Sequence, residues 1–475
     1  MRTRTIVPKG ASATIAAFTS MFVALAAEAQ DEVRSVAPPM IEEIVVTAQK
    51  RAQSAQDVPI TIKALSGEDL SARGIGSVTD LQYATPGLVI DDVATIPIIY
   101  LRGVGTDAFL LSADLSVANY VDGVYFPFSL STVKSLSSVE RVEVIKGPQG
   151  TLFGRNATGG AISVVTKEPS EDAYTGSIDV GYGSFDHFTQ RGFVSGPMFE
   201  TVSFSLSGLH SAKSHYYDVA PESPVDHLRD EREYAGSAKL RWRPSELFDV
   251  TVAGYGTDTQ GVAGAVLVNE RPSLLASLLS AQPVRADYED AGNVEPQYSN
   301  TNYVGSVTAN LHPGPFDVKS ITAYQDLAAN TYFDFDGTTV PIFDAESHQP
   351  NDGLSAKTFT EELQFLSNEE GWLSRFDVEW IAGFYFLNNT AGFTNLDLKI
   401  LGGLPVGLVP GLADGLVFHT SGILDTKSYA GFAQSTWSPL SWSALTVGAR
   451  YQFEERRAHR VDLDLSLRND EGGEG

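Results

Sequence analysis

Residues 443–454 read SALTVGARYQFE, and apolar and polar side chains alternate along this stretch. Leucine, valine, alanine, tyrosine and phenylalanine share one set of positions, and threonine, glycine, arginine, glutamine and glutamate share the other. Successive side chains of a β-strand point to opposite faces of a sheet. This period of two therefore predicts a strand with one apolar and one polar face.

The same alternation recurs from residue 174 onward and predicts about eleven strands. They cover residues 174–183, 187–195, 201–212, 234–242, 249–258, 302–312, 316–327, 357–366, 376–388, 427–437 and 443–454. Short links alternate with long ones, which lie at residues 213–233, 259–301, 328–356 and 389–426. A soluble β-sandwich rarely has this rhythm. Short periplasmic turns and long outer loops are typical of an outer-membrane barrel, so residues 174–475 are expected to form an all-β antiparallel transmembrane barrel.

A different pattern precedes the barrel and predicts a compact α+β domain over residues 50–167. Ser66 and Ser77 each stand three residues before an aspartate, which is the signature of a helix N-terminus. Asp122-Gly123 predicts a tight hairpin turn. Short strands are expected at residues 58–65, 96–101, 118–126, 139–145 and 161–166.

The glycine-rich stretch at residues 147–155, GPQGTLFGR, has some likeness to a phosphate-binding loop. Such a loop needs lysine and then serine or threonine directly after its last glycine, and Arg155-Asn156 stands there instead. We therefore expect these glycines to allow tight turns that pack against a confining wall.

The N-terminus has the pattern of an export signal. Basic residues precede a mostly apolar stretch at residues 11–27, and Ala27-Glu28-Ala29 fits a cleavage site, so residues 1–29 are predicted to be a signal peptide. Residues 30–49 are predicted to be a flexible periplasmic tether. The β-branched segment near its end is suited to joining the edge of another protein's sheet.

Charge and composition exclude several classes of function. The chain has 59 acidic and 33 basic residues and a formal net charge of −26, which does not suit a nucleic-acid partner. It has no cysteine, which excludes thiolate metal sites and cysteine nucleophiles. No nucleophile elbow or paired histidine motif suggests an enzyme, and neither a cofactor nor a resident metal is predicted.

Five motifs of the mature chain, taken together and in this order, resemble the TonB-dependent outer-membrane receptors. They are EIVVTA at 43–48, YLRG at 100–103, VDGVY at 121–125, VERVEVIKGP at 139–148 and LFGRNATGGAI at 152–162. The resemblance implies a plug domain inside a barrel of about 22 strands. Since about eleven strands are predicted, we expect this chain to hold the N-terminal part of a truncated barrel, with residues 460–475 in an outer loop.

The resemblance also implies active transport. The plug apex and outer loops would hold the ligand, and the TonB protein of the inner-membrane complex would pull on a TonB box. That box would consist of Glu43, Ile44, Val45, Val46, Thr47 and Ala48, which we expect to be mobile and to pair as a strand with TonB.

The implied partners are the TonB protein, outer-membrane lipid and a small-molecule ligand, which in this family is most often a ferric siderophore. Cobalamin, haem and oligosaccharides remain alternative ligands, because nothing in the loops selects among them. A passive porin or adhesin barrel is a different alternative, and it would need neither the box nor the plug.

A charge contact between plug and barrel is also predicted. Glu362 shares its strand face with Thr358 and Thr360, the polar side that would face a plugged lumen. A carboxylate there is expected to find a cationic partner. Arg141 and Arg155 belong to the plug motifs, so we predict that Glu362 contacts one of them. A Glu362 solvated by water is the alternative.

Overall fold

The structure is a computed structural model, and it describes most of the chain beyond the predicted signal peptide. The described residues are 44–56, 58–93, 96–106, 113–129, 138–214, 218–219, 230–261, 289–290, 297–334, 343–346, 353–400, 416–440 and 442–467. The predicted signal peptide, the first part of the predicted tether and the central parts of the predicted long loops lie outside them. Among the described helices, none is long and apolar enough to cross a membrane.

The plug domain is built on a five-stranded sheet with the order β3-β8-β9-β6-β7. Its strands are β3 (Thr61–Ser66), β6 (Val117–Val121), β7 (Val124–Phe126), β8 (Val139–Lys146) and β9 (Gly160–Thr166). β6 and β9 run parallel, and the other neighbours run antiparallel. Outside this sheet the described plug has an antiparallel pair and three short helices: β4 (Leu88–Val93), β5 (Ile96–Leu101), α2 (Gly67–Ala72), α3 (Leu81–Ala84) and α4 (Gly150–Phe153).

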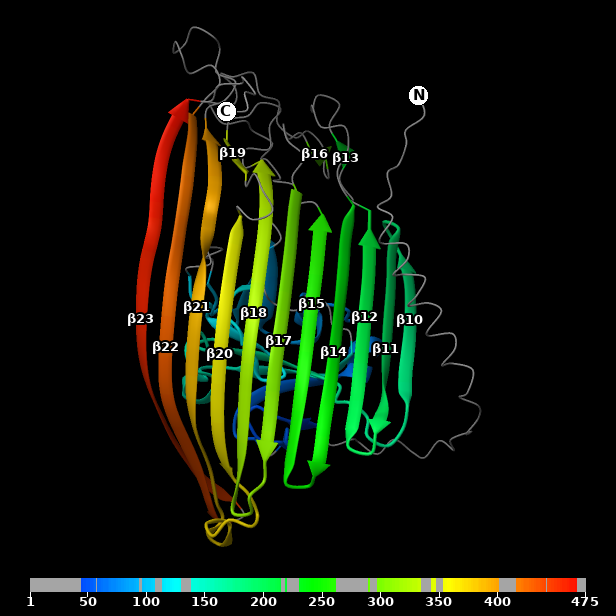
Figure 1. Cartoon of the computed structure of the whole chain (residues 1–475), viewed down its shortest axis with the longest axis vertical. Coiled ribbons are helices and arrows are strands. Elements are labelled where there is room, and N and C mark those ends of the chain that lie inside the picture. The colour runs from blue at the N-terminus through cyan, green and yellow to red at the C-terminus, as the bar shows by residue number, and fades with distance from the viewer. Residues whose placement is uncertain are drawn as a thin grey trace. The chain divides into compact units, whose positions relative to one another are not determined.

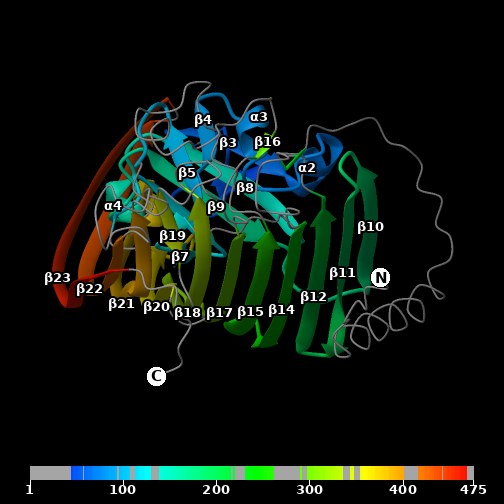
Figure 2. The ribbon, with the colours of Figure 1, turned by 90° about the horizontal axis from the view of Figure 1, so that it is seen from above.

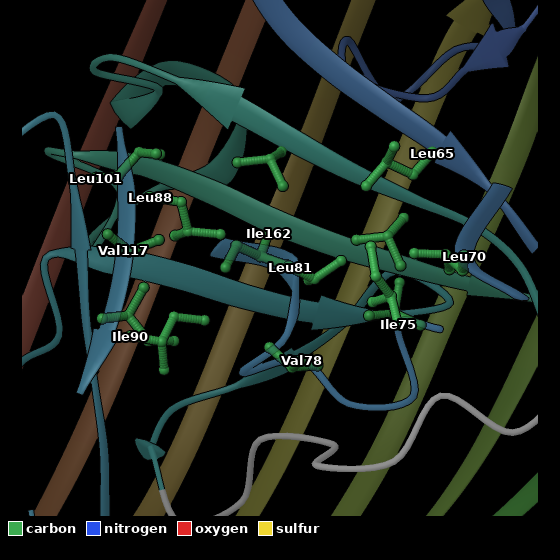
Figure 3. Close-up of a cluster of buried hydrophobic side chains, with 14 of the residues drawn as sticks. Leu65, Leu70, Ile75, Val78, Leu81, Leu88, Ile90, Leu101, Val117 and Ile162 are labelled. Carbon is green, nitrogen blue, oxygen red and sulfur yellow. The ribbon is translucent and has the colours of Figure 1, made fainter. Parts of the chain in front are cut away.

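An apolar core lies between one face of the plug sheet and the covering helices and β4–β5 pair (Figure 3). Leu70 of α2 and Leu81 of α3 pack there against Ile162 of β9. β8 shows how the alternation divides the two faces. Val142 and Val144 are fully buried in this core, whereas Ile145 belongs to a second cluster on the opposite face. The opposite face of the plug sheet is therefore available to contact other parts of the chain.

Most local signals in the plug sequence predicted the caps and turns that the structure contains. Ser66 caps α2 by accepting a hydrogen bond from the Asp69 amide at 3.1 Å, as predicted. The Asp122-Gly123 hairpin joins β6 and β7, and both residues have positive φ. The second helix begins later than predicted, because the Asp80 carboxylate accepts from Ser77 and closes a turn before α3.

The second half of the chain forms a twelve-stranded sheet, which we call the wall (Figure 1). Every pairing of neighbours within it is antiparallel. Its strands are β10 (Thr175–Gly183), β11 (His187–Phe199), β12 (Val202–Lys213), β14 (Glu231–Ser245), β15 (Phe248–Gly261), β17 (Gln297–Leu311), β18 (Phe316–Asp334), β19 (Phe343–Glu346), β20 (Leu354–Ser367), β21 (Val378–Ile400), β22 (Leu416–Leu440) and β23 (Ser443–Leu467). β10 and β23 lie at opposite ends of this order, and no pairing joins them within the described residues.

The predicted strands were too short on the side of the long connections. β21 runs to Ile400 and β22 begins at Leu416, within a segment that was predicted to be a loop. The expectation that residues 460–475 lie in a loop is wrong for residues 460–467, which belong to β23. The alternation of apolar and polar residues ends where both faces of a strand meet water, but backbone pairing continues beyond that point.

The wall curves around the plug domain, which lies on its concave side (Figure 2). Thr358, Thr360 and Glu362 of β20 are buried there, so the predicted inward face of this strand is confirmed. The glycine-rich stretch forms α4, which the sequence did not predict, and α4 contacts β22 and β23. Gly154 has φ of 74°, and a Cβ there would lie 2.8 Å from Arg450 Nη2 on β23. This glycine is needed because the turn packs closely against the wall.

Candidate functional site

The predicted TonB box packs against the plug. β1 (Val45–Val46) pairs antiparallel with β2 (Gln53–Ser54). Val46 and Ala48 are fully buried, in a cluster that includes Ile145 of the plug and Phe432 of the wall. The expectation that the plug leaves this segment uncaptured is therefore wrong for residues 44–48, while Glu43 lies outside the described residues. No local pattern in the sequence indicated this packing, since the partners of the segment are far away along the chain.

A buried carboxylate holds the segment in place. The backbone amide and the hydroxyl of Thr47 donate hydrogen bonds to Glu143 Oε1 at 2.8 and 3.0 Å. Arg141 Nε donates to the same oxygen at 2.8 Å. Glu143 has no exposed surface, and these donors to Oε1 compensate for part of the cost of burying its charge, since Oε2 has no hydrogen-bond partner among the described residues. Arg141 was predicted to contact the wall, but its ion pairs are to Glu140 and Glu143 inside the plug.

Lys50 joins the segment to the wall. Its ammonium forms an ion pair with Glu362 of β20, and both side chains are buried. It also lies 5.2 Å from the ring centroid of Phe432 and 5.8 Å from that of Phe153. Burial lowers the pKa of Lys50, and the Glu362 carboxylate acts in the opposite direction. Glu362 does find a cationic partner, but this partner is Lys50 and neither of the predicted arginines.

Arg51 adds a second link between the segment and the wall. Its guanidinium donates to Ser367 Oγ at 2.8 Å and to the Trp380 carbonyl. Lys50 and Arg51 stand two and three residues after the predicted box, so the chain is joined to the wall shortly after this segment.

Arg155 contacts the wall at a different strand. It forms ion pairs with Glu454 of β23 and with Asp114 of the plug. Arg456 of β23 completes a ring of four charges, with distances of 2.5 Å to Asp114 and 2.6 Å to Glu454. The predicted contact between this plug arginine and the wall exists, with Glu454 in place of Glu362. The alternation of residues 443–454 had already placed Glu454 on the polar face.

Lys239 of β14 makes a third charged contact, which the sequence analysis missed. Its ammonium lies 3.1 Å from Asp122 of the β6–β7 hairpin and 3.2 Å from Glu168. Lys239 occupies a polar position in an alternating strand. This position indicates that its side chain faces inward, but it does not predict which residue the side chain contacts. In the described residues, no group of three or more potential ligands could hold a metal ion.

Comparison with known proteins identifies the domain that contains Asp122, Glu143 and Arg155. The family model of the TonB-dependent receptor plug domain matches residues 54–161. Residues 54–161 thus belong to the plug-domain family of the TonB-dependent receptors. The location of the chain is the outer membrane, and its fold is a plug domain followed by antiparallel strands of the receptor barrel.

Two curated relatives match the receptor over part of their length. The pesticin receptor of Yersinia pestis is 33% identical over 208 residues, which is 43% of this chain and 30% of the relative. The ferric-pyoverdine 358 receptor of Pseudomonas putida is 24% identical over 325 residues, which is 64% of this chain and 37% of the relative. The chain therefore spans about a third of the length of these curated relatives.

Solved structures have the same fold. The ferric yersiniabactin uptake receptor of Yersinia pestis superposes with a TM-score of 0.67 at 20% identity, covering 87% of this chain and 62% of that one. The ferripyoverdine receptor of Pseudomonas aeruginosa superposes with a TM-score of 0.66 at 13% identity, covering 89% of this chain and 55% of that one. At these identities the likeness concerns the fold alone.

Proposed function

We propose that this receptor imports a scarce ligand, a ferric siderophore, and that the TonB protein drives import by pulling on residues 43–48. The observation that carries the proposal is the position of this segment. Thr47 joins it to the plug at Glu143, and Lys50, three residues further on, joins the chain to the wall at Glu362. Force on one short strand therefore reaches both the plug and its contact with the barrel.

The segment is held strongly enough to be ordered and weakly enough to be displaced. β1 has only two residues, so its ladder with β2 is short. Full burial of the Val46 side chain contributes about 1.5–3 kcal/mol. The hydrogen bond from Thr47 Oγ1 to the charged Glu143 contributes about 1.5–3 kcal/mol. A partner that offers a longer strand edge can replace these contacts, since added main-chain bonds supply affinity.

The choice of ligand rests on the relatives. The names of the receptors above include ferric pyoverdine and ferric yersiniabactin. Cobalamin is an alternative, because a vitamin B12 transporter of Vibrio vulnificus is 25% identical over 218 residues. Haem and oligosaccharides also remain alternative ligands. A passive porin or adhesin is less consistent with a plug that is held by three sets of charged contacts.

The test is the growth of a strain in which the gene is deleted and then restored at full length, on a panel of single iron sources. We expect the restored strain to grow on at least one ferric chelate that does not support the deletion strain. Growth should disappear when the TonB protein is also removed. Equal growth with and without TonB would rule out energised import, and rescue by cobalamin or haem alone would identify another ligand.

A further inference from the structure

A shallow groove of about 440 Å³ lies on the outer face of the wall, across the neighbouring strands β14, β15, β17 and β18 (Figure 1). Its floor consists of four glycines: Gly236, Gly254, Gly256 and Gly305. Tyr255 and Val304 alternate with these glycines along their strands and pack on the plug side, in a cluster with Phe126. The glycines therefore face away from the plug, toward the membrane.

The floor is open at two of its glycines. A Cβ added to Gly254 or to Gly305 would have no described atom within 4 Å, and the two residues are direct neighbours on β15 and β17. Tyr303 encloses one side, because its ring lies 3.1 Å from the position that a Cβ of Gly256 would take. Tyr324 borders the groove on β18, where it pairs with Gly305. An open strip without side chains therefore runs beside two aromatic rings.

The floor lies inside the part of the wall that crosses hydrocarbon. Gly254 and Gly305 each stand six residues from a strand end that is joined by a short turn, at Phe248 and Leu311 respectively. With a rise of about 3.3 Å per residue and a tilt of about 40°, six residues place the floor about 15 Å above the periplasmic end. The apolar band of such barrels is about 25 Å tall. The floor is therefore near its middle.

The groove changes character along its length. Asp326 lines the outer end, ten residues from the short-turn end of β18, which is about 25 Å in height and thus the edge of the apolar band. Tyr303 and Tyr324 lie between this edge and the floor and are about half exposed. Beyond the floor, Val252 and Val307 are exposed on the same face. Tyrosine rings are typical of the headgroup level, so the groove opens toward the headgroups of the outer leaflet.

The chemistry of the groove selects its occupant. An empty groove in hydrocarbon loses contacts on one side, so it is filled. Water is disfavoured, because glycines and aromatic rings offer it few partners and the strands beneath are paired with one another. On their inner face the same strands border a polar cavity of about 260 Å³ against the plug, so the apolar lining is specific to the outer face. An unbranched hydrocarbon chain is the filler that the surroundings supply.

We propose that this groove binds one acyl chain of an outer-leaflet lipid, with the chain along Gly254 and Gly305 and the headgroup outside the two tyrosine rings. The proposal depends on the outer-membrane location and not on the cargo. The chain is surrounded by hydrocarbon in the bilayer as well, so its binding comes from close packing and not from removal of apolar surface from water. The site therefore retains a lipid in preference to the rest of the wall, with moderate affinity.

Native mass spectrometry measures this retention. The full-length receptor is purified in detergent, stripped of lipid and titrated with lipid A, a phosphorylated glycolipid with several acyl chains. Gly254→Leu and Gly305→Leu each place a side chain in open space, so both variants should fold. We expect each to weaken binding of the first lipid by about threefold to tenfold, because leucine occupies the floor.

Gly431→Leu is the matched control. Gly431 lies on the outer face of β22, away from the groove, and a Cβ there would be in ordinary contact with Phe384 at 3.9 Å. This change should leave the affinity for the first lipid unaltered. Equal affinities in the two groove variants and the unmodified receptor, or an equal loss in Gly431→Leu, would overturn the proposal.

Photocrosslinking in cells distinguishes a lipid from a protein partner. The photoreactive residue p-benzoylphenylalanine replaces Tyr324 in the full-length receptor, and lipids are labelled with radioactive phosphate. We expect a labelled adduct of lipid mass, and a severalfold lower yield when Gly305→Leu is also present. An adduct of protein mass would show that a membrane protein fills the groove. A lipid adduct that Gly305→Leu leaves unchanged would show unspecific contact, and either result would overturn the proposal.

Discussion

The plug meets the wall in two very different ways on neighbouring strands. The apolar seam is the contact of residues 44–50, which we call the held segment, and of α4 with Ile381, Leu387 and Phe432 of β21 and β22. The polar seam is the cavity beside β14 to β18. Buried side chains are close-packed in the first, and there is open space between charged groups in the second. The difference indicates that the apolar seam holds the plug and that the polar seam can open when the segment is pulled.

Loss of Phe432 should weaken the apolar seam most. Its side chain is 4% exposed, and Gly383 leaves room for it, since a Cβ there would lie 2.5 Å from Phe432 Cζ. We expect Phe432→Ala to lower the free energy of unfolding by about 3–5 kcal/mol. Urea unfolding of the purified full-length receptor in detergent measures the effect. Phe384→Ala, on the outer face of β21, is the control and should cost much less; equal losses would show that the seam does not hold the plug.

Loss of the Glu362 carboxylate should have the next largest effect. Glu362→Gln leaves Lys50 buried without its counter-ion. We expect the free energy of unfolding to fall by about 3 kcal/mol, the lower end of the range for a broken buried pair. Glu379→Gln is the control, because Glu379 is half exposed and lies 4.0 Å from Arg51. That change should cost about 0–1 kcal/mol.

The same ion pair predicts how stability depends on pH. Burial lowers the pKa of Lys50 in the folded state, so the unfolded state binds more protons between that lowered pKa and the ordinary value. Stability should therefore rise with pH through this window. In Glu362→Gln the opposing effect of the carboxylate is absent, and the rise should begin at a lower pH. Unfolding curves at a series of alkaline pH values test this, and a fall in stability over the window would contradict it.

Thr47→Val should weaken the attachment of residues 44–48 to the plug. It removes the hydroxyl that donates to Glu143, a contact of about 1.5–3 kcal/mol. Affinity for the periplasmic domain of the TonB protein should rise by about tenfold to a hundredfold. Thr61→Val, at an exposed position in β3, is the control and should leave the affinity unchanged. A weaker affinity in Thr47→Val would mean that the hydroxyl serves the complex with TonB.

The smallest effect is expected in the polar seam. Lys319 has no partner to lose within the described residues. We expect Lys319→Gln to change the free energy of unfolding by less than about 0.5 kcal/mol. Lys239→Gln should cost clearly more, because Asp122 and Glu168 both lose their cation. Similar losses for the two variants would show that Lys319 has a structural role.

The sequence predicted the strands of the wall and their inward faces, because alternation depends only on neighbouring residues. It placed Glu362 and Glu454 correctly on the polar side for this reason. The partners could not be predicted in the same way. Lys50 and Glu362 are separated by 312 positions, and their meeting depends on how the plug sits against the wall. Arg141 shows the same limit, since its two carboxylate partners, Glu140 and Glu143, are one and two residues away on its own strand.

The held segment is the clearest case of this limit. A β-branched stretch between polar residues predicts a free strand, and β1 is indeed a strand. Its burial depends on Glu143, which points away from the plug core because it alternates with Val142 and Val144 on β8. The alternation was visible in the sequence, but the identity of the group that meets Glu143 was not.

Energised uptake by a receptor with an altered segment tests the central claim most directly. Val45→Pro removes a backbone donor from β1, whereas Val45→Thr keeps a β-branched residue. In cells with the full-length receptor, we measure binding of a transported ferric chelate at the surface and its uptake. The account predicts that Val45→Pro abolishes uptake and leaves surface binding intact, while Val45→Thr retains both. Normal uptake by Val45→Pro would contradict the account.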